Sequence, residues 1–235
     1  MDVKYELRQV LVARRAMAFA RLPTASALLA SNFPSSISVS DQTVVAGYMP
    51  FRTEIDPLPL LRAFSLKGAQ CAMPRINSPS PFWGRVGMGG AVAQRSVQEL
   101  VANPQTPPSP NPFPTHSLLG EGGRGDALDF HLCDPDNQNH FTPNKLGLFE
   151  PHDTLPTATP NILLVPLLGF DRHGNRIGYG KGYYDNAIAY LRATSTILAI
   201  GVAFAEQEVE LIPTQPHDQR LDWIITQNEA YRFPS

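Results

Sequence analysis

The chain has 235 residues, 43% of them hydrophobic, and a formal net charge of −2, which suits one domain of ordinary size with a packed core. This near-neutral charge argues against binding to nucleic acid or to an anionic membrane through bulk charge, and two cysteines are too few for a disulfide framework or a zinc site. Because the chain has no run of 18 apolar residues and no apolar signal segment near its amino terminus, we expect a cytoplasmic protein, and a monomer by default.

Apolar periodicity and helix-breaking residues divide the chain into alternating helices and strands. Residues 3–29 space their apolar and basic side chains as a helix does, and Pro23 predicts a break into two helices. Further helices are expected at 58–66, where Gly68 ends the helix, and at 184–192. Short apolar runs bounded by turn residues predict strands at 43–48, 69–73, 128–132, 162–165, 196–202 and 221–226.

This alternation is typical of the α/β fold class. We expect a single three-layer domain over residues 1–235, in which helices flank a mostly parallel sheet. In such sheets, ligands collect at the loops beyond the carboxyl ends of the strands.

One segment departs from the pattern. Residues 78–125 contain eight prolines and eight glycines without any period. That composition indicates a low-complexity, disordered insertion into a surface loop, a place where a fold tolerates extra residues well.

The most informative stretch is 164–185, LVPLLGFDRHGNRIGYGKGYYD, in which an apolar run leads through a turn into a glycine-rich loop. The alternating Gly178, Gly180 and Gly182 allow neighbouring backbone N–H groups to form a concave anion site. A helix that begins near Tyr183 would add the positive end of its dipole to the same site.

Charged residues surround this loop. Arg176 and Lys181 supply full positive charges, and Asp185 with Asp171 could hold a hard cation such as Mg²⁺. The glycine spacing matches neither GxxxxGK[ST] nor GxGxxG, so the glycines alone leave open a plain turn between a strand and a helix. The flanking cations and carboxylates favour a site for nucleotide phosphates and a metal ion.

The run PLLGFDRHGNRIGYGKGYYD closely resembles the signature of the 5-formyltetrahydrofolate cyclo-ligase family. Further blocks resemble elements of that family in the same order, and these are KYELRQVLVARR (4–15), VVAGYMPFRTEID (44–56), LGLFEP (146–151) and PHDQRLDWIIT (216–226). The resemblance covers the chain apart from roughly 78–125. It implies a ligase of one-carbon metabolism that uses ATP and Mg²⁺ to convert a reduced folate, 5-formyltetrahydrofolate, into 5,10-methenyltetrahydrofolate.

The resemblance also implies a mechanism. ATP phosphorylates the formyl oxygen, N10 attacks the activated carbon, and phosphate departs, so the protein must position and neutralise the γ-phosphoryl group. Lys181 and Arg176 are the expected catalytic cations. The expected nucleotide-binding residues are Lys4, Arg8, Arg176, Ile177, Gly178, Tyr179, Gly180, Lys181, Gly182, Tyr183 and Tyr184. The expected folate-binding residues are Glu54, Met49, Tyr179, Gly180, Lys181, Gly182 and Tyr183, with Phe51 beside Met49. The expected Mg²⁺ ligands are Asp185 and Asp218, with Asp222 as an alternative to Asp218.

Each of these residues also has an ordinary structural interpretation. Lys4 and Arg8 lie four apart on one helix face and could contact one anion or form a solvated basic surface. Asp185 could cap a helix, and Asp218 could stabilise a turn. Glu54 matches the adjacent N–H and amino donors of a pterin ring, or it is an exposed loop residue.

Other residues and functions remain open at this stage. Arg14 and Arg15 are expected to be solvated or structural, and His173 and His217 lie in turn sequence and receive no role. Two further function classes are a folate- or nucleotide-binding module without turnover and an α/β enzyme that binds a phosphorylated sugar. The complete charged set around the loop argues against the first, and the amino-terminal basic pair argues against the second.

Overall fold

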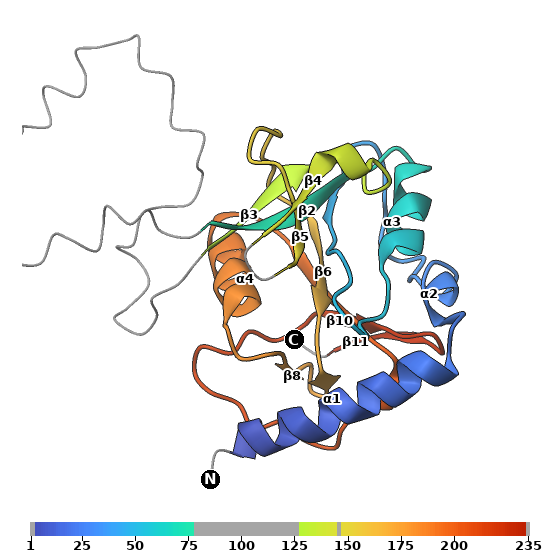
Figure 1. The fold of residues 1–235 in the computed structure, drawn as a ribbon, viewed down its shortest axis with the longest axis vertical. Coiled ribbons are helices and arrows are strands. Elements are labelled where there is room, and N and C mark those ends of the chain that lie inside the picture. The colour runs from blue at the N-terminus through green and yellow to red at the C-terminus, as the bar shows by residue number, and fades with distance from the viewer. Residues whose placement is uncertain (1–2, 78–126, 145–146, 234–235) are drawn as a thin grey trace, which may run out of the picture.

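The described residues are 3–77, 127–144 and 147–233 of a computed structural model (Figure 1). The helices are α1 (Val3–Arg21), α2 (Ala25–Leu28), α3 (Leu58–Ser65) and α4 (Tyr183–Thr194), with 3-10 turns η3 (Gln138–His140) and η4 (Ala205–Gln207). The strands are β1 (Val44–Ala46), β2 (Gln70–Asn77), β3 (Ala127–Leu132), β4 (Phe141–Pro143), β5 (Phe149–Pro151), β6 (Ile162–Pro166), β7 (Gly169–Phe170), β8 (Arg176–Ile177), β9 (Leu198–Val202), β10 (Trp223–Ile225) and β11 (Ala230–Arg232). The insertion expected at 78–125 lies outside the described residues.

Seven of these strands form one sheet in the order β11-β10-β9-β6-β1-β2-β3. The five central strands of this order, from β10 to β2, run parallel to one another. The two edge strands are antiparallel, β11 to β10 and β3 to β2. The predicted α/β domain with a mostly parallel sheet is therefore confirmed. The carboxyl ends of β1, β2, β6, β9 and β10 lie at one edge, where ligands collect in such sheets.

Helices cover both faces of this sheet, α4 on one and α2 with α3 on the other (Figure 1). Successive side chains of a strand point to opposite faces. Accordingly Leu164 belongs to the apolar cluster that contains Phe64 of α3, and Leu163 to the cluster that contains Ile188 of α4. Strand β6 is buried on both faces, which explains its uninterrupted apolar sequence.

Strand β2 continues four residues beyond the predicted end at Met73 and includes Pro74. A proline interrupts a sheet because it has no N–H to donate. The Ala72 carbonyl points toward β1 and accepts a hydrogen bond from the Gly47 N–H. The backbone nitrogen of Pro74, two residues later, points to the same side, where β1 has already ended. The missing donor is therefore tolerated while β2 pairs with β3 up to Asn77.

Helix α1 lies across the lower end of the domain beside β8 (Figure 1). Leu11 of this helix is fully buried with Leu168, Ile177 and Ile212. Gly169 makes this approach possible, since a Cβ at that position would lie 2.7 Å from the Leu11 side chain. The contact brings the basic residues of α1 to the carboxyl edge of the sheet.

We expect Gly169→Ala to lower the free energy of unfolding by about 1–3 kcal/mol, because α1 must shift to accept the methyl group. Urea denaturation of the variant would measure this effect. Gly178→Ala is the matched control, because its Cβ would meet nothing within 4 Å. Equal stability of the two variants would contradict the tight contact between α1 and β7.

No helix in the described part of the chain is both long and apolar enough to cross a bilayer.

Candidate functional site

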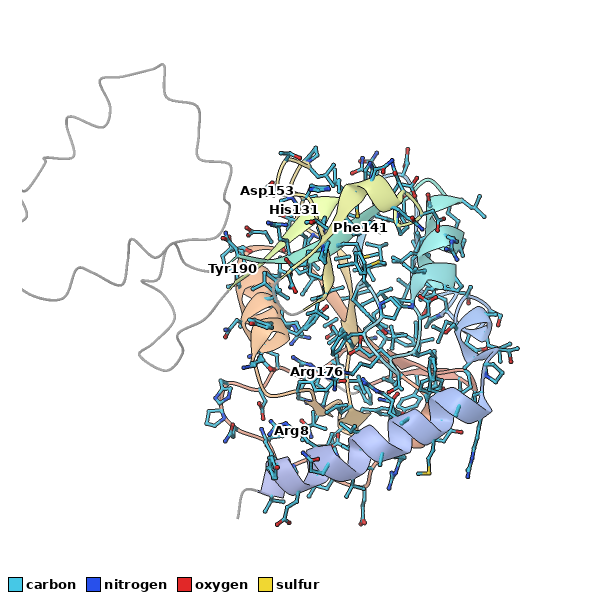
Figure 2. The ribbon with its side chains drawn as sticks, viewed as in Figure 1. Arg8, His131, Phe141, Asp153, Arg176 and Tyr190 are labelled. Atoms are coloured by element: carbon cyan, nitrogen blue, oxygen red, sulfur yellow. The ribbon has the colours of Figure 1, made fainter. Side chains whose placement is uncertain are left out.

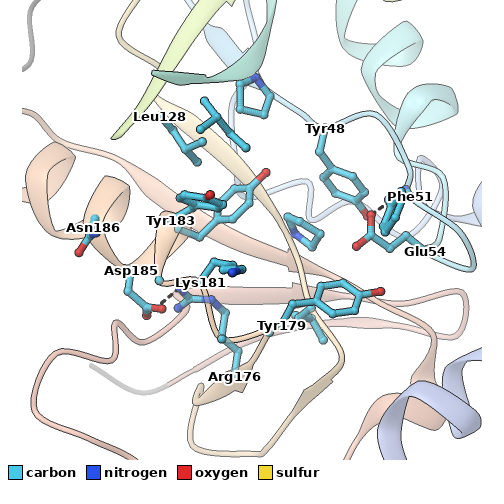
Figure 3. A pocket seen from close by; sticks show the side chains of 18 of the residues that line it. Tyr48, Phe51, Glu54, Leu128, Arg176, Tyr179, Lys181, Tyr183, Asp185 and Asn186 are labelled. Atoms are coloured by element: carbon cyan, nitrogen blue, oxygen red, sulfur yellow. Dashed lines mark hydrogen bonds and ion pairs between the residues drawn. The ribbon is translucent and has the colours of Figure 1, made fainter. Parts of the chain in front are cut away.

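A cavity of about 860 Å³ opens at the carboxyl edge of the sheet, and α1, the loop after β1, the loop between β8 and α4, and the β4–β5 hairpin all contribute to its wall (Figure 3). Every residue predicted above for nucleotide or folate binding lines it, and so do the two expected Mg²⁺ ligands, Asp185 and Asp218. Arg8 reaches it from α1 and Arg176 from β8 (Figure 2). Residues more than 200 positions apart in the sequence therefore share one surface, although their individual roles remain predictions.

The glycine-rich loop takes the conformation that its composition predicts. Gly180 and Gly182 have φ angles of +86° and +74°, in the left-handed region, and Gly182 directly precedes α4. Arg8 holds the loop from α1, since its Nε donates to the Gly178 carbonyl over 2.9 Å. A side chain at 180 would meet the Arg8 guanidinium at 3.0 Å. The loop is thus fixed against α1 with its cavity-facing side open.

Lys181 extends from this loop and is exposed. Figure 3 shows it near the centre of the lining, with Asp185 on one side and Glu54 on the other. Within the described residues, the Lys181 ammonium has no hydrogen-bond or ion-pair partner. A free cation beside glycine N–H groups and the amino end of a helix provides the conditions for binding an anion.

Arg176 has a different environment, because its side chain is only 5% exposed. Its Nη2 donates to Asp185 Oδ1 over 2.8 Å, and its Nη1 donates to the Gln219 carbonyl. Burial lowers the pKa of Arg176, and the Asp185 charge opposes that shift. The guanidinium that was predicted to neutralise phosphate therefore also holds Asp185 in place.

Asp185 does not act as a helix cap. Gly182 occupies the cap position of α4 without any side-chain capping bond. The Asp185 carboxylate instead accepts hydrogen bonds from Arg176 and from the Gln219 N–H at 2.9 Å. Its orientation toward the cavity is thus set by two fixed donors.

Asp218 makes the turn contact that its structural interpretation predicts, and its role as a metal ligand stays a prediction. Its Oδ2 accepts from the Gln215 N–H at 2.7 Å, as a turn aspartate does, and also lies 2.6 Å from Lys4 Nζ. The two side chains are 11% and 20% exposed, for Lys4 and Asp218 respectively, so this ion pair is largely shielded from water. Lys4, predicted to contact phosphate, is thus paired with the Asp218 carboxylate.

The donor set fits a metal ion that a bound phosphate helps to hold. No group of three or more His, Cys, Asp or Glu side chains in the described residues could enclose an ion. Mg²⁺ usually takes one or two carboxylates and completes its shell with water and phosphate oxygens. Asp185 and Asp218 line one cavity and satisfy that requirement.

Asp171 and Asp222, the other carboxylates considered, do not line the cavity. Both oxygens of Asp222 accept from Arg192 at 3.0 Å, and Oδ2 also accepts from the Ala199 N–H, so this residue ties α4 to β9. Asp171 is fully buried and accepts backbone N–H groups, including that of Ile212. Neither carboxylate is placed to bind a cation in this cavity, because neither belongs to its lining.

Glu54 is buried, at 8% exposure, so its interpretation as an exposed loop residue is wrong. Its Oε2 accepts from the Phe51 N–H at 2.9 Å, and its Oε1 lies 3.4 Å from Arg15 Nη1. Burial raises the pKa of Glu54, whereas the backbone hydrogen bond and the Arg15 charge oppose the rise. A buried carboxylate in a cavity wall can recognise a ligand edge that carries paired N–H donors.

The sequence interpretation missed much of the apolar wall. The additional lining residues are Tyr48, Arg52, Met73, Pro74, Ile76, Leu128, Leu148, Phe149, Glu150, Pro166, Leu167, Asn186, Gln215 and His217. Phe149 is 56% exposed although it is a large apolar residue. Its block, LGLFEP, resembles a family element, but only the cavity lining shows that Leu148, Phe149 and Glu150 face this site.

Known proteins resemble this chain in sequence. The sequence model of the 5-formyltetrahydrofolate cyclo-ligase family matches residues 1–227. A Haemophilus influenzae protein named 5-formyltetrahydrofolate cyclo-ligase is 35% identical over 112 residues, which cover 46% of this chain and 53% of that protein. The Escherichia coli K12 protein of the same name is 30% identical over 127 residues, covering 52% and 63%. The chain thus aligns with less than two thirds of the length of these relatives.

Solved structures share the fold. The 5,10-methenyltetrahydrofolate synthetase from Mycoplasma pneumoniae superposes with a TM-score of 0.57 and 18% identity, covering 97% of this chain and 99% of that one. The 5,10-methenyltetrahydrofolate synthetase from Aquifex aeolicus gives a TM-score of 0.60 and 22% identity, covering 99% and 94%. At these identities the likeness establishes the fold.

Proposed function

Because this chain belongs to the 5-formyltetrahydrofolate cyclo-ligase family, we propose that it catalyses the ATP- and Mg²⁺-dependent cyclisation of 5-formyltetrahydrofolate to 5,10-methenyltetrahydrofolate, with release of ADP and phosphate. One observation carries the proposal. A single cavity contains an unpaired lysine on a glycine loop and, on its other side, a buried carboxylate. These are the groups that a phosphorylated nucleotide and a pterin ring would require.

The nucleotide phosphates bind at the glycine loop. The backbone N–H groups of this loop and the amino end of α4 attract anions, and Arg8 keeps the loop in place. Lys181 neutralises the charge that develops on the transferred phosphoryl group. Asp185 and Asp218 would hold Mg²⁺, which when bound would supply further neutralisation of phosphate charge.

The reduced folate binds on the opposite side of the cavity. Glu54 accepts hydrogen bonds from the ring N–H and amino donors of the pterin. Met49 and Tyr183 supply apolar and aromatic surface for the ring. This arrangement directs the N5-formyl group toward Lys181 and away from Glu54.

The bond changes then follow. The formyl oxygen attacks the γ-phosphorus and ADP leaves, which converts that oxygen into part of a good leaving group. N10 attacks the activated carbon and gives up its proton to solvent, and the carbon–oxygen bond breaks as phosphate departs, which leaves the methenyl bridge. Lys181 stabilises negative charge in the first transfer and on the departing phosphate, so the chain contributes positioning and charge rather than a covalent intermediate.

An absorbance assay tests this function. The protein is mixed with 5-formyltetrahydrofolate, ATP and Mg²⁺, and absorbance is followed near the methenyl-folate band. A rise that needs all three additions supports the cyclo-ligase. No rise, with folate and nucleotide still binding by calorimetry, would identify a binding module without turnover.

The proposal includes a monomer in the cytoplasm that binds small molecules and has no nucleic-acid or membrane partner. Light scattering after size-exclusion chromatography would test the monomer. A stable dimer would contradict that part while leaving the reaction untouched.

We also propose a single domain whose activity does not need residues 78–125. Asn77 of β2 and Ala127 of β3 are register partners at the sheet edge, so a short turn can join them. Replacing 78–125 with a short Gly-containing linker should keep turnover within about twofold of the full chain. A folded but inactive deletion would show that the segment belongs to the site.

A further inference from the structure

Arg15 of α1 is 1% exposed and lies directly behind the cavity wall. Its Nε donates to Thr53 Oγ1 over 3.3 Å, its Nη1 lies 3.4 Å from Glu54 Oε1, and its Nη2 donates to the Tyr179 hydroxyl. Two of these acceptors belong to the loop after β1, and the third belongs to the glycine loop. One guanidinium thus contacts both the loop after β1 and the glycine loop, two parts of the cavity wall.

We propose that Arg15 is a positioning residue that keeps Glu54 ionised and oriented for the pterin, and that ties Glu54 to the phosphate-binding loop through Tyr179. This inference rests on the proposed function. It gives a role in substrate recognition to a residue that does not itself line the cavity.

The electrostatic part follows from burial. A buried carboxylate tends to take up a proton, and an opposite charge in contact with it restores the ionised form. The titratable and charged groups around Glu54 are Arg15 from α1, Tyr48, Arg52 and Asp56 from the loop after β1, Tyr179 from the glycine loop and Tyr184 from α4. Burial raises the pKa of both Tyr48 and Tyr184, so these phenols stay neutral. Arg52 is exposed and lies over the Phe51 ring at 4.8 Å, so Arg15 is the cation that contacts the carboxylate.

The positional part follows from the shape of the guanidinium. Arginine presents its donors in a rigid planar fork, whereas the lysine ammonium is a point charge on a flexible stem. The Arg15 fork reaches three acceptors at once, and its carbon Cζ lies 5.4 Å from the centre of the Tyr179 ring. Tyr179 stands between Gly178 and Gly180, so this contact fixes the flexible part of the loop relative to Glu54.

The first test measures the dissociation constant of 5-formyltetrahydrofolate against pH, without nucleotide. Binding needs ionised Glu54, so affinity falls as the pH drops through its raised pKa. In Arg15→Met the opposing charge is gone, and we expect the midpoint of this fall to move up by about one pH unit. Arg15→Lys should return the midpoint close to the wild-type value.

Arg14→Met is the matched control. Arg14 is the neighbouring residue on α1, and its Nη1 donates to the Glu208 carbonyl, away from Glu54. We expect its midpoint to equal that of the wild type. If Arg15→Met melts cooperatively and keeps the wild-type midpoint, the inference is overturned.

A titration of the Glu54 carboxyl carbon by ¹³C NMR in the ligand-free protein separates this inference from the proposed function. Glu54→Gln assigns the resonance. Absence of folate binding in the wild type would remove the proposed function, while the Glu54 pKa in Arg15→Met would still show whether Arg15 controls the carboxylate.

Tyr179→Phe tests the link to the loop and provides for the case in which Arg15→Met does not fold. It removes only the hydroxyl that Arg15 contacts, so the pH midpoint should not change. A non-hydrolysable ATP analogue should lower the dissociation constant of 5-formyltetrahydrofolate in the wild type. The factor by which the analogue lowers it should be about fivefold smaller in Tyr179→Phe. An unchanged gain would overturn the positional part of the inference.

Discussion

Lys181→Ala is expected to lower kcat at least tenfold while leaving the fold intact. The ammonium is exposed, projects from the glycine loop and has no partner within the described residues, so its removal breaks no internal contact. The substitution removes a positive charge at the place where phosphoryl transfer would develop negative charge. Groups in such positions typically contribute one or more orders of magnitude to kcat. Steady-state kinetics with ATP and 5-formyltetrahydrofolate would measure the loss.

Two companion variants make this result specific. Lys67→Ala removes another exposed lysine, just after α3 and outside the cavity lining, and should keep wild-type turnover. Lys181→Arg keeps the charge and should recover part of the activity. Near-normal kcat in Lys181→Ala would exclude Lys181 from phosphoryl transfer, even where the wild-type protein is an active cyclo-ligase.

The glycine loop could be predicted from the sequence because its signals are local. A buried apolar strand, a turn and three alternating glycines occur within one short segment, and Gly180 and Gly182 take the positive φ angles that glycine accepts most readily. By contrast, the pair between Lys4 and Asp218 joins residues 214 positions apart. No periodicity or motif encodes such a pair, which exists only because α1 folds back across the sheet edge.

The burial of Arg15 could have been predicted from the spacing of its neighbours in the sequence. Leu11, Arg15 and Ala18 are spaced four and three residues apart, so they share one helix face, and that face is buried. A charged residue on an apolar face indicates a buried, paired side chain. The short strands β4, β5, β7, β8 and β11 were not predicted, because each has only two or three residues and none was identified within a longer apolar run, as β1 and β10 were.

The second large effect is expected for Asp185→Asn. The substitution keeps the shape of the side chain but removes the negative charge that faces Arg176, whose guanidinium is 95% buried. A buried cation without its counter-ion is costly, and we expect the free energy of unfolding to fall by about 2 kcal/mol. If Asp185 also holds Mg²⁺, kcat should fall on the order of 100-fold, and the Mg²⁺ concentration needed for half-maximal rate should rise.

Asp222→Asn distinguishes these two effects. Asp222 pairs with Arg192 on the same helix, α4, but lies outside the cavity lining, and its side chain is 33% exposed. Its loss should cost about 1 kcal/mol of stability, with turnover and Mg²⁺ dependence unchanged. A loss of activity that is confined to Asp185→Asn would therefore report metal binding rather than a weakened α4. If Asp185→Asn instead reaches the wild-type rate at the wild-type Mg²⁺ concentration, the carboxylate serves only to hold Arg176, and the metal must be bound through Asp218 and the phosphates.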